Sequence, residues 1–222
     1  MELSEVMRTS GAVRAFTGAP VPAGVLYRVL DNARFAPSGG NLQGWHVVVV
    51  RDRARRRRLA DLSSAGWRQY RVEQAAGYRG FSVTSPAPPD LEATADIPHH
   101  PMLEAIEEVP ELLVITVDLR VLAVFDRDLD RPSVVGGGSI YPFVQNVLLA
   151  ARDEGLGGVL TTFLAAREPA AAEILGLPSH HAIAAMVGLG TPQRQVTRLS
   201  RHPVESFATI DTFDGEMLPA DG

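Results

Sequence analysis

Apolar and polar positions follow two different periods along this chain. Residues 25–36 and 140–154 place apolar side chains three to four positions apart, the spacing of an amphipathic helix. Residues 46–50 and 111–118 are short, mostly apolar runs, which is the pattern of buried strands. The pattern therefore predicts helices and strands mixed along one chain.

Start and stop signals refine these elements. Asp52 is placed to cap a helix that runs through Leu62, and Ser139 to cap the helix over 140–154, which Gly155 would end. The pattern further predicts a strand near 159–163, a helix near 168–175 and a strand over 182–189. We interpret residues 1–222 as a single domain.

Two segments fit neither period. Residues 63–110 include a proline-rich stretch, and we expect a variable lid or loop region there. Residues 197–222 are too polar for a core helix and form an expected C-terminal arm, but the arm contains four large apolar residues: Val204, Phe207, Ile210 and Phe213. These side chains need a surface to cover them, either on a second subunit or on the same domain.

Composition narrows the class of protein. The chain has 222 residues, 45% of them hydrophobic, which suffices to bury a large core. It has no cysteine, so disulfides, thiolate metal sites and a cysteine nucleophile are excluded. Apolar runs such as 112–117 are far shorter than the ~18 to 20 residues of a membrane-crossing helix, and Met1–Ser10 has no signal-peptide core. We expect a cytoplasmic protein with no membrane contact.

The charge pattern argues against nucleic acid as a partner. The net charge is -5, although six arginines fall within residues 51–58. We interpret this run as the solvated face of a helix whose buried side holds Leu59 and Leu62. A phosphate-binding patch for a cofactor or a polynucleotide is the alternative.

Glycines and histidines give few chemical signals on their own. Residues 155–158 follow a helix and enter a strand, the reverse of a dinucleotide-binding loop. Residues 136–139 lead into a predicted helix, where free backbone N–H groups could bind an anion or a ribityl chain. The alternative interpretation is that Ser139 only caps the helix. The pairs His99–His100 and His180–His181 lack the spacing of a chelating helix face, so no metal site is predicted. Redox chemistry would need a cofactor.

A resemblance supplies that cofactor. Residues 36–45, Ala-Pro-Ser-Gly-Gly-Asn-Leu-Gln-Gly-Trp, resemble the A-P-S-x-x-N-x-Q-P-W signature of the FMN-dependent nitroreductase family. Residues 13–16, 145–157, 175–178 and the basic stretch 198–205 also resemble family segments, in the same order. Two departures stand out: Gly44 replaces the signature proline, which is expected to loosen the turn, and Ser10, Gly11 and Ala12 stand where the family usually has Arg-Arg-Ser.

The resemblance implies an α+β fold in which helices flank a mixed sheet, an intertwined homodimer, and FMN at the subunit interface with the arm crossing to the partner. Arginine guanidinium groups bind a phosphate through paired, charge-assisted hydrogen bonds. The residues that match the family's cofactor contacts are Arg8, Arg14, Pro37, Ser38, Asn41, Gln43, Ser139, Thr161, Thr162, Arg198 and Arg201.

The resemblance also implies a reaction. NADH or NADPH would reduce FMN, and a planar acceptor such as a nitroarene or quinone would then be reduced in a ping-pong cycle that needs no catalytic side chain. Trp67, Tyr70, Tyr78 and Phe81 would stack on the acceptor, or else form satellite core. The alternatives are a flavin-dependent dehydrogenase of a biosynthetic pathway and a non-catalytic protein with weak or no flavin binding.

Overall fold

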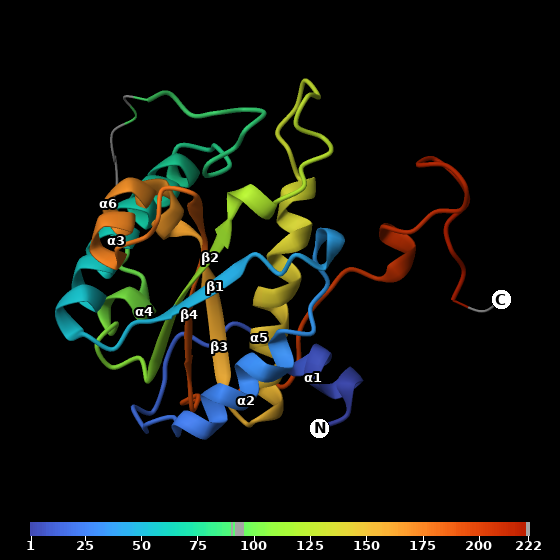
Figure 1. The fold of residues 1–222 in the computed structure, drawn as a ribbon. Coiled ribbons are helices and arrows are strands. Elements are labelled where there is room, and N and C mark those ends of the chain that lie inside the picture. Colours follow the sequence, from blue (N-terminus) through green and yellow to red (C-terminus); the bar gives the residue numbers. More distant parts are fainter. Residues whose placement is uncertain (90, 92–95, 221–222) are drawn as a thin grey trace.

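The computed structural model describes residues 1–89, 91 and 96–220 (Figure 1). At its centre lies a four-stranded sheet in the order β1-β2-β4-β3, in which all neighbouring strands are antiparallel. The strands are β1 (Trp45–Val49), β2 (Glu111–Asp118), β3 (Gly157–Thr161) and β4 (His181–Gly190). An isolated bridge between Ala12 and Gly158 adds a parallel pairing at the β3 edge. The expected α+β fold is confirmed.

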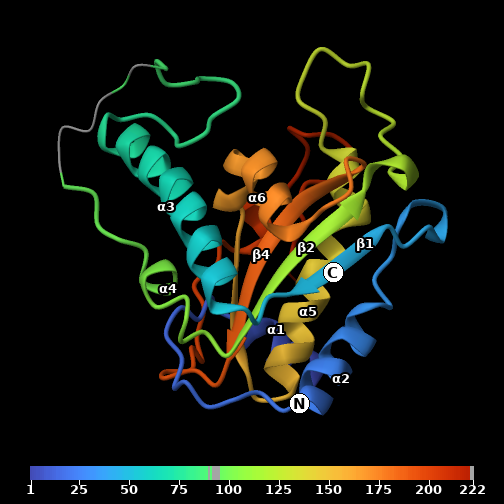
Figure 2. The same cartoon turned by 60° about the vertical axis from the view of Figure 1, so that its left-hand side comes forward.

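Helices cover both faces of the sheet (Figures 1 and 2). On one face lie α2 (Ala23–Ala33) and α5 (Tyr141–Asp153), and on the other lie α3 (Arg53–Ala75) and α6 (Glu168–Leu175). The short helices α1 (Leu3–Thr9) and α4 (Pro101–Glu104) pack beside α5 and α3 respectively. Among the described residues, no helix combines the length and the apolar character needed to cross a membrane.

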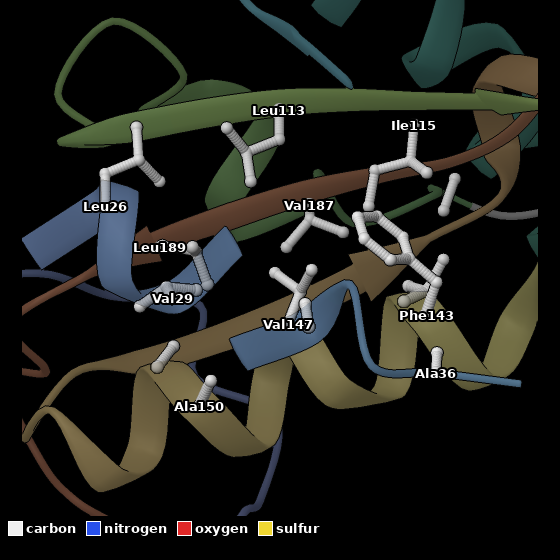
Figure 3. Packing of buried hydrophobic residues seen from close by; sticks show 14 of the residues in the cluster. Leu26, Val29, Ala36, Leu113, Ile115, Phe143, Val147, Ala150, Val187 and Leu189 are labelled. Atoms are coloured by element: carbon white, nitrogen blue, oxygen red, sulfur yellow. The ribbon is translucent and has the colours of Figure 1, made fainter. Parts of the chain in front are cut away.

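Alternation along the strands divides the core into two layers. In β2, Leu113 and Ile115 face α2 and α5, where they meet Phe143 and Val147 (Figure 3). The intervening residues of β2, among them Leu112, belong to the second layer under α3 and α6. Because successive strand side chains point to opposite faces, one continuous apolar run supplies both layers.

Of the two predicted ends of α5, the C-terminal end is confirmed and the N-terminal cap is not. Gly155 follows the helix with a φ of 79°, the left-handed conformation that commonly ends helices. The predicted cap is wrong, because Ile140 occupies the N-cap position and Ser139 closes a preceding 3-10 turn, Val135–Ser139. The Ser139 hydroxyl is used elsewhere, as described below.

Helix α3 is longer than predicted. Asp52 caps it as expected, since its carboxylate accepts a hydrogen bond from the Arg55 amide at 2.8 Å. The helix continues beyond Leu62, so residues 63–75 of the expected loop region are helical. Gly66 permits this because a Cβ there would lie 2.6 Å from the Phe163 carbonyl oxygen. Residues 90 and 92–95 of the same region are outside the described residues.

The arginine run is not uniformly solvated. Arg56 is buried, and its guanidinium donates hydrogen bonds to the carbonyls of Val50, Val109 and Pro110 at 2.7, 2.6 and 3.3 Å. Leu59 is buried as predicted. One of the six arginines is therefore a structural link between α3 and the start of β2, which leaves less of the run as a basic surface.

The C-terminal arm carries its apolar residues into solvent. Phe207 is 71% exposed and Phe213 is 96% exposed, while Val204 and Ile210 are also exposed. In Figure 1 the arm leaves the body of the chain near α1 and α5 and projects away from it. The sequence left two alternatives for this arm, packing on a second subunit or on its own domain. In the described residues, which extend to 220, the arm does not pack these side chains on its own domain.

Candidate functional site

A turn after α2 brings the signature residues together. The hydroxyl of Ser38 accepts a hydrogen bond from the Gln43 amide at 3.0 Å, which closes the turn. Asn41 and Gln43 have φ values of 55° and 50°, so the chain reverses through the left-handed region twice. Pro37, Asn41 and Gln43 are exposed, and their side chains are available to a ligand.

Ser139 joins this turn from the other end of the sequence. Its Oγ accepts a hydrogen bond from the Gly39 amide at 3.0 Å, so the glycine-rich segment before α5 braces the signature turn. Two segments that the resemblance assigns to one cofactor are thus in direct contact. A hydroxyl here serves the turn rather than the helix.

Gly44 does not loosen the turn as expected. A Cβ at this position would lie 2.6 Å from Cγ2 of Val121, and the Gly44 carbonyl accepts a hydrogen bond from the Asp118 amide at 2.8 Å. The backbone is therefore tightly packed where the signature has proline.

A second group of residues surrounds a cavity of about 220 Å³ at the other end of α5. Ser10, Gly11, Ala12 and Arg14 line one side of it, and Arg152 lines another. Its remaining walls are Leu148, Gln195 and residues 156–160. A volume below the ~300 Å³ at which small-molecule pockets usually begin suits one end of a cofactor rather than a whole one.

Arg152 is a candidate ligand-binding residue that sequence reasoning missed. Its Nε donates a hydrogen bond to the Thr9 hydroxyl at 3.1 Å, which holds the guanidinium at the cavity. In the described part of the chain, neither Arg14 nor Arg152 forms an ion pair. Only the fold brings the last turn of α5 next to residues 10–14, so no local pattern could have marked Arg152.

Gln195, which lines the cavity, has a buried acceptor that lacks a partner among the described residues. The amide nitrogen of Gln195 donates to the carbonyls of Thr9 and Val196 at 3.0 and 2.9 Å, which fixes the orientation of the side chain. Its Oε1 is buried and has no hydrogen-bond partner among the described residues. An unpaired buried acceptor is costly, and a ligand hydroxyl would relieve that cost. Two guanidinium groups beside such an acceptor fit a molecule with an anionic end and a hydroxylated chain.

Thr161 and Thr162 end β3 and lead into an aromatic cluster. Thr161 is buried and its hydroxyl has no partner among the described residues, whereas Thr162 is exposed. The next residue, Phe163, lies 5.4 Å from Trp67 between ring centroids, and Trp67 stacks on Tyr70 at 6.0 Å. The strand end is therefore adjacent to a planar, apolar wall.

This aromatic cluster includes a residue that the sequence did not single out for it. The ring of His100 lies 5.1 Å from Trp67, and its Nδ1 is buried without a partner among the described residues. Burial lowers the pKa of His100, and the positive charge of Arg14 lowers it further, so Arg14 is within electrostatic reach of the cluster. Tyr78 and Phe81 are exposed beyond the end of α3 and have no ring contact with the cluster.

The other predicted contacts lie apart. Arg8 is exposed on α1 and does not line the cavity. Arg198 and Arg201 are exposed on the arm, where Arg201 donates to the Ser200 carbonyl. Ser139 precedes α5 and Arg152 lies in its last turn, so a rise of 1.5 Å per residue separates the turn from the cavity by roughly 20 Å. A single chain does not bring all the predicted residues into one site.

Comparison with known proteins gives a consistent result. The sequence model of the Nitroreductase family matches residues 8–191. A protein named NADH dehydrogenase from Thermus thermophilus is 33% identical over 197 residues, covering 87% of this chain and 88% of the relative. A nitrobenzene nitroreductase from Ectopseudomonas oleovorans is 24% identical over 230 residues, covering 94% and 96% respectively. A solved structure, the NADPH:FMN oxidoreductase of Vibrio harveyi complexed with NAD+, matches with a TM-score of 0.68 at 21% identity, covering 95% of this chain and 77% of that one.

Proposed function

Because the chain belongs to the Nitroreductase family and is an NAD(P)H oxidoreductase, we propose that it binds FMN and transfers electrons from NADH or NADPH to nitroaromatic, quinone or similar planar acceptors by a ping-pong mechanism. The observation that carries the proposal is the cavity shared by Arg14 and Arg152, with the unpartnered Oε1 of Gln195 in its wall. The cysteine-free composition makes a cytoplasmic location part of the proposal.

The cavity would hold the phosphate end of the cofactor. A phosphate monoester carries close to two negative charges at pH 7, and the guanidinium groups of Arg14 and Arg152 offer planar, charge-assisted hydrogen bonds to it. Arg152 would substitute for the arginines that residues 10–12 lack. The Gln195 Oε1 would accept a hydrogen bond from a ribityl hydroxyl.

The flavin ring would lie between the end of β3 and a signature turn. The chemistry that FMN supplies is electron transfer from the nicotinamide to the acceptor. Thr161 and Thr162 border the ring position, and Trp67 and Tyr70 form an apolar wall that excludes water and stacks a planar acceptor. The protein's part is binding and orientation, so no side chain is assigned as a proton donor.

We propose that the active form is a homodimer. The turn at 37–43 lies roughly 20 Å from the cavity within one chain, so a second copy is needed for both to contact one cofactor. The exposed Phe207 and Phe213 on the arm need an apolar surface, and a partner subunit offers one.

The test begins with the absorbance spectrum of the purified protein before and after incubation with FMN. We expect a bound flavin spectrum, bleaching by NADH or NADPH under anaerobic conditions, and recovery of the spectrum on adding a nitroarene or quinone. Parallel lines in double-reciprocal plots would support the ping-pong order. A protein that stays colourless with FMN contradicts the proposal.

The role of the aromatic wall can be tested separately. Trp67→Phe keeps a planar ring, whereas Trp67→Ala removes it and should shift the ratio of kcat/KM between a nitroarene and a small quinone. Tyr78→Ala removes a predicted substrate contact that lies outside the aromatic cluster, so it serves as the matched comparison. A change in the same ratio for Tyr78→Ala would support a lid that includes this residue. If Trp67→Ala leaves the ratio of kcat/KM unchanged, the aromatic cluster is part of the hydrophobic core and does not contact the acceptor.

A further inference from the structure

A cluster of polar side chains lies at one end of the second core layer, where β2 pairs with β1 and β4. Along β2, the residues on the α3 face are Leu112, Val114, Thr116 and Asp118, so the last two carry polar groups. Register places Thr116 opposite His46 of β1 and Asp118 opposite His181 of β4. The residue before His181 is another histidine, so imidazole and carboxylate groups gather at one end of the sheet.

The side chains of Asp118, His180 and His181 converge. Each offers one ligand atom, and these three atoms all lie within 4.8 Å of one another. The adjacent histidine rings are 5.1 Å apart and tilted by 58°, so they do not point apart as an extended chain would require. The sequence did not predict this cluster because Asp118 lies more than 60 residues from the two histidines. Only the pairing of β2 with β4 brings the three side chains together.

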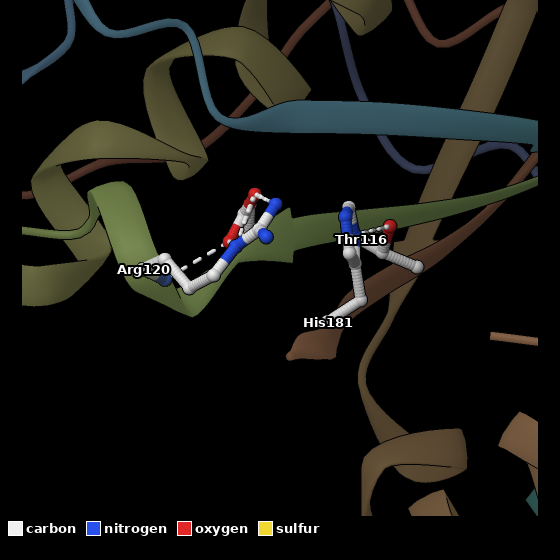
Figure 4. Close-up of polar contacts among 4 residues, drawn as sticks. Thr116, Arg120 and His181 are labelled. Carbon is white, nitrogen blue, oxygen red and sulfur yellow. Dashed lines mark hydrogen bonds and ion pairs between the residues drawn. The ribbon is translucent and has the colours of Figure 1, made fainter. Parts of the chain in front are cut away.

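Thr116 orients the central imidazole (Figure 4). Its hydroxyl is 3.5 Å from the His46 carbonyl, to which it can donate, and 3.0 Å from Nδ1 of His181. A hydroxyl that donates to the carbonyl accepts from Nδ1–H, and the lone pair of His181 is then on Nε2. Metal-binding histidines are commonly held in this way, with one ring nitrogen donating to a protein oxygen and the other binding the ion.

We propose that Asp118, His180 and His181 form a binding site for a divalent transition-metal ion such as Zn²⁺, with Thr116 as the positioning residue for His181. Two imidazoles and one carboxylate suit Zn²⁺, Co²⁺ or Ni²⁺ and do not suit Mg²⁺, which requires oxygen ligands. The ring of His46 lies 6.1 Å from that of His181, so it borders the cluster but is outside the group of three converging ligand atoms.

Arg120 competes for the carboxylate. Its Nη2 lies 2.7 Å from Oδ2 of Asp118 and its Nε lies 3.0 Å from Oδ1, while the Arg120 amide also donates to Oδ1 (Figure 4). The guanidinium is on an exposed side chain and can move aside when an ion binds. Arg120 therefore sets the affinity of the site, and its removal should strengthen metal binding.

The experiment is calorimetric titration of the chelator-treated protein with Zn²⁺, with Co²⁺ as a spectroscopic probe of the ligands. We expect one equivalent of Zn²⁺ to bind and no heat from Mg²⁺. His181→Ala and His180→Ala should each weaken binding at least 10-fold, and Thr116→Val roughly 10- to 100-fold, the usual effect of losing an orienting group. Arg120→Gln should tighten it. His202→Gln, on the exposed arm, is the matched control and should change nothing.

The outcomes separate cleanly. Absence of Zn²⁺ binding, or binding unchanged in both histidine variants, overturns the proposal. Because His181 lies in β4 and its variant can fail to fold, circular dichroism is recorded for every variant, and His180→Ala, in the turn before the strand, then decides the result. None of these measurements depends on FMN, so the metal site and the flavin function stand or fall separately.

Discussion

Ser139 and Gly39 are 100 residues apart in sequence, yet the serine hydroxyl accepts the glycine amide at 3.0 Å. This bond ties the start of α5 to the signature turn. Ser139→Ala should therefore loosen the turn, lower the free energy of unfolding by about 0.5–1.5 kcal/mol and weaken FMN binding. Urea unfolding and flavin fluorescence titration measure the two effects. Ser64→Ala, an exposed serine on α3, is the control.

The two cavity arginines should dominate FMN affinity. Arg14→Ala should weaken binding by about 2–5 kcal/mol, and Arg152→Ala by about 1.5–3 kcal/mol, because each leaves part of the phosphate charge unpaired. Fluorescence titration of apoprotein with FMN gives the affinities, and riboflavin, which lacks the phosphate, should show a much smaller difference. Arg58→Ala on the exposed face of α3 provides the control. Unchanged flavin content in Arg14→Ala would remove Arg14 from the site.

Gly44 should resist replacement by larger residues, including the proline of the family signature. Gly44→Ala places a methyl group against Val121 and should cost about 1–3 kcal/mol of stability. The double variant Gly44→Ala/Val121→Ala should recover most of that loss, because it removes the clashing methyl group. Denaturant melts of the four proteins of this cycle test the prediction. Equal stability of wild type and Gly44→Ala would show that the contact relaxes freely.

Asp126 should make stability depend on pH. Hydrogen bonds from the Val134 amide, the Ser133 hydroxyl and the Arg131 guanidinium hold the pKa of the Asp126 carboxyl well below its usual range. A carboxyl with a depressed folded-state pKa stabilises the fold above its unfolded pKa of about 3.9, and this stabilisation is lost as the pH falls further.

Asp126→Asn should therefore lower the Tm most at pH 7, and the difference from wild type should shrink below about pH 4. Asp130→Asn, an exposed carboxylate of the same loop, should have little effect at either pH. A difference in Tm that stays constant with pH would mean that Asp126 acts through packing alone.

Local patterns predicted those elements whose interactions are local or periodic. The continuous run 111–118 is the observed β2, and the helix predicted near 168–175 is the observed α6, which ends at Gly176 with a φ of 66°. In both cases the signals lie within the segment. The order of the main helices and strands also followed, because alternation of the two apolar periods specifies it, but the short helices α1 and α4 were not predicted.

Long-range packing accounts for what the patterns missed. Helix α3 extends through Ser63 and Gly66, poor helix formers, because that stretch packs against Phe163. Arg56 resembles its neighbours in sequence, and only the arrival of Val109 and Pro110 makes it a buried donor. Arg152 and Gln195 reach the cavity for the same reason, since no nearby residue marks them.

The exposed arm has a kinetic consequence. In the proposed homodimer, Phe207 and Phe213 reach their final environment only after two chains associate, so ordering of the arm around these two residues is a second-order process. At low protein concentration the central sheet would form first and the flavin-binding cleft would be completed later. Recovery of flavin binding after dilution from denaturant should then speed up as the protein concentration rises, while recovery of helical circular dichroism should not.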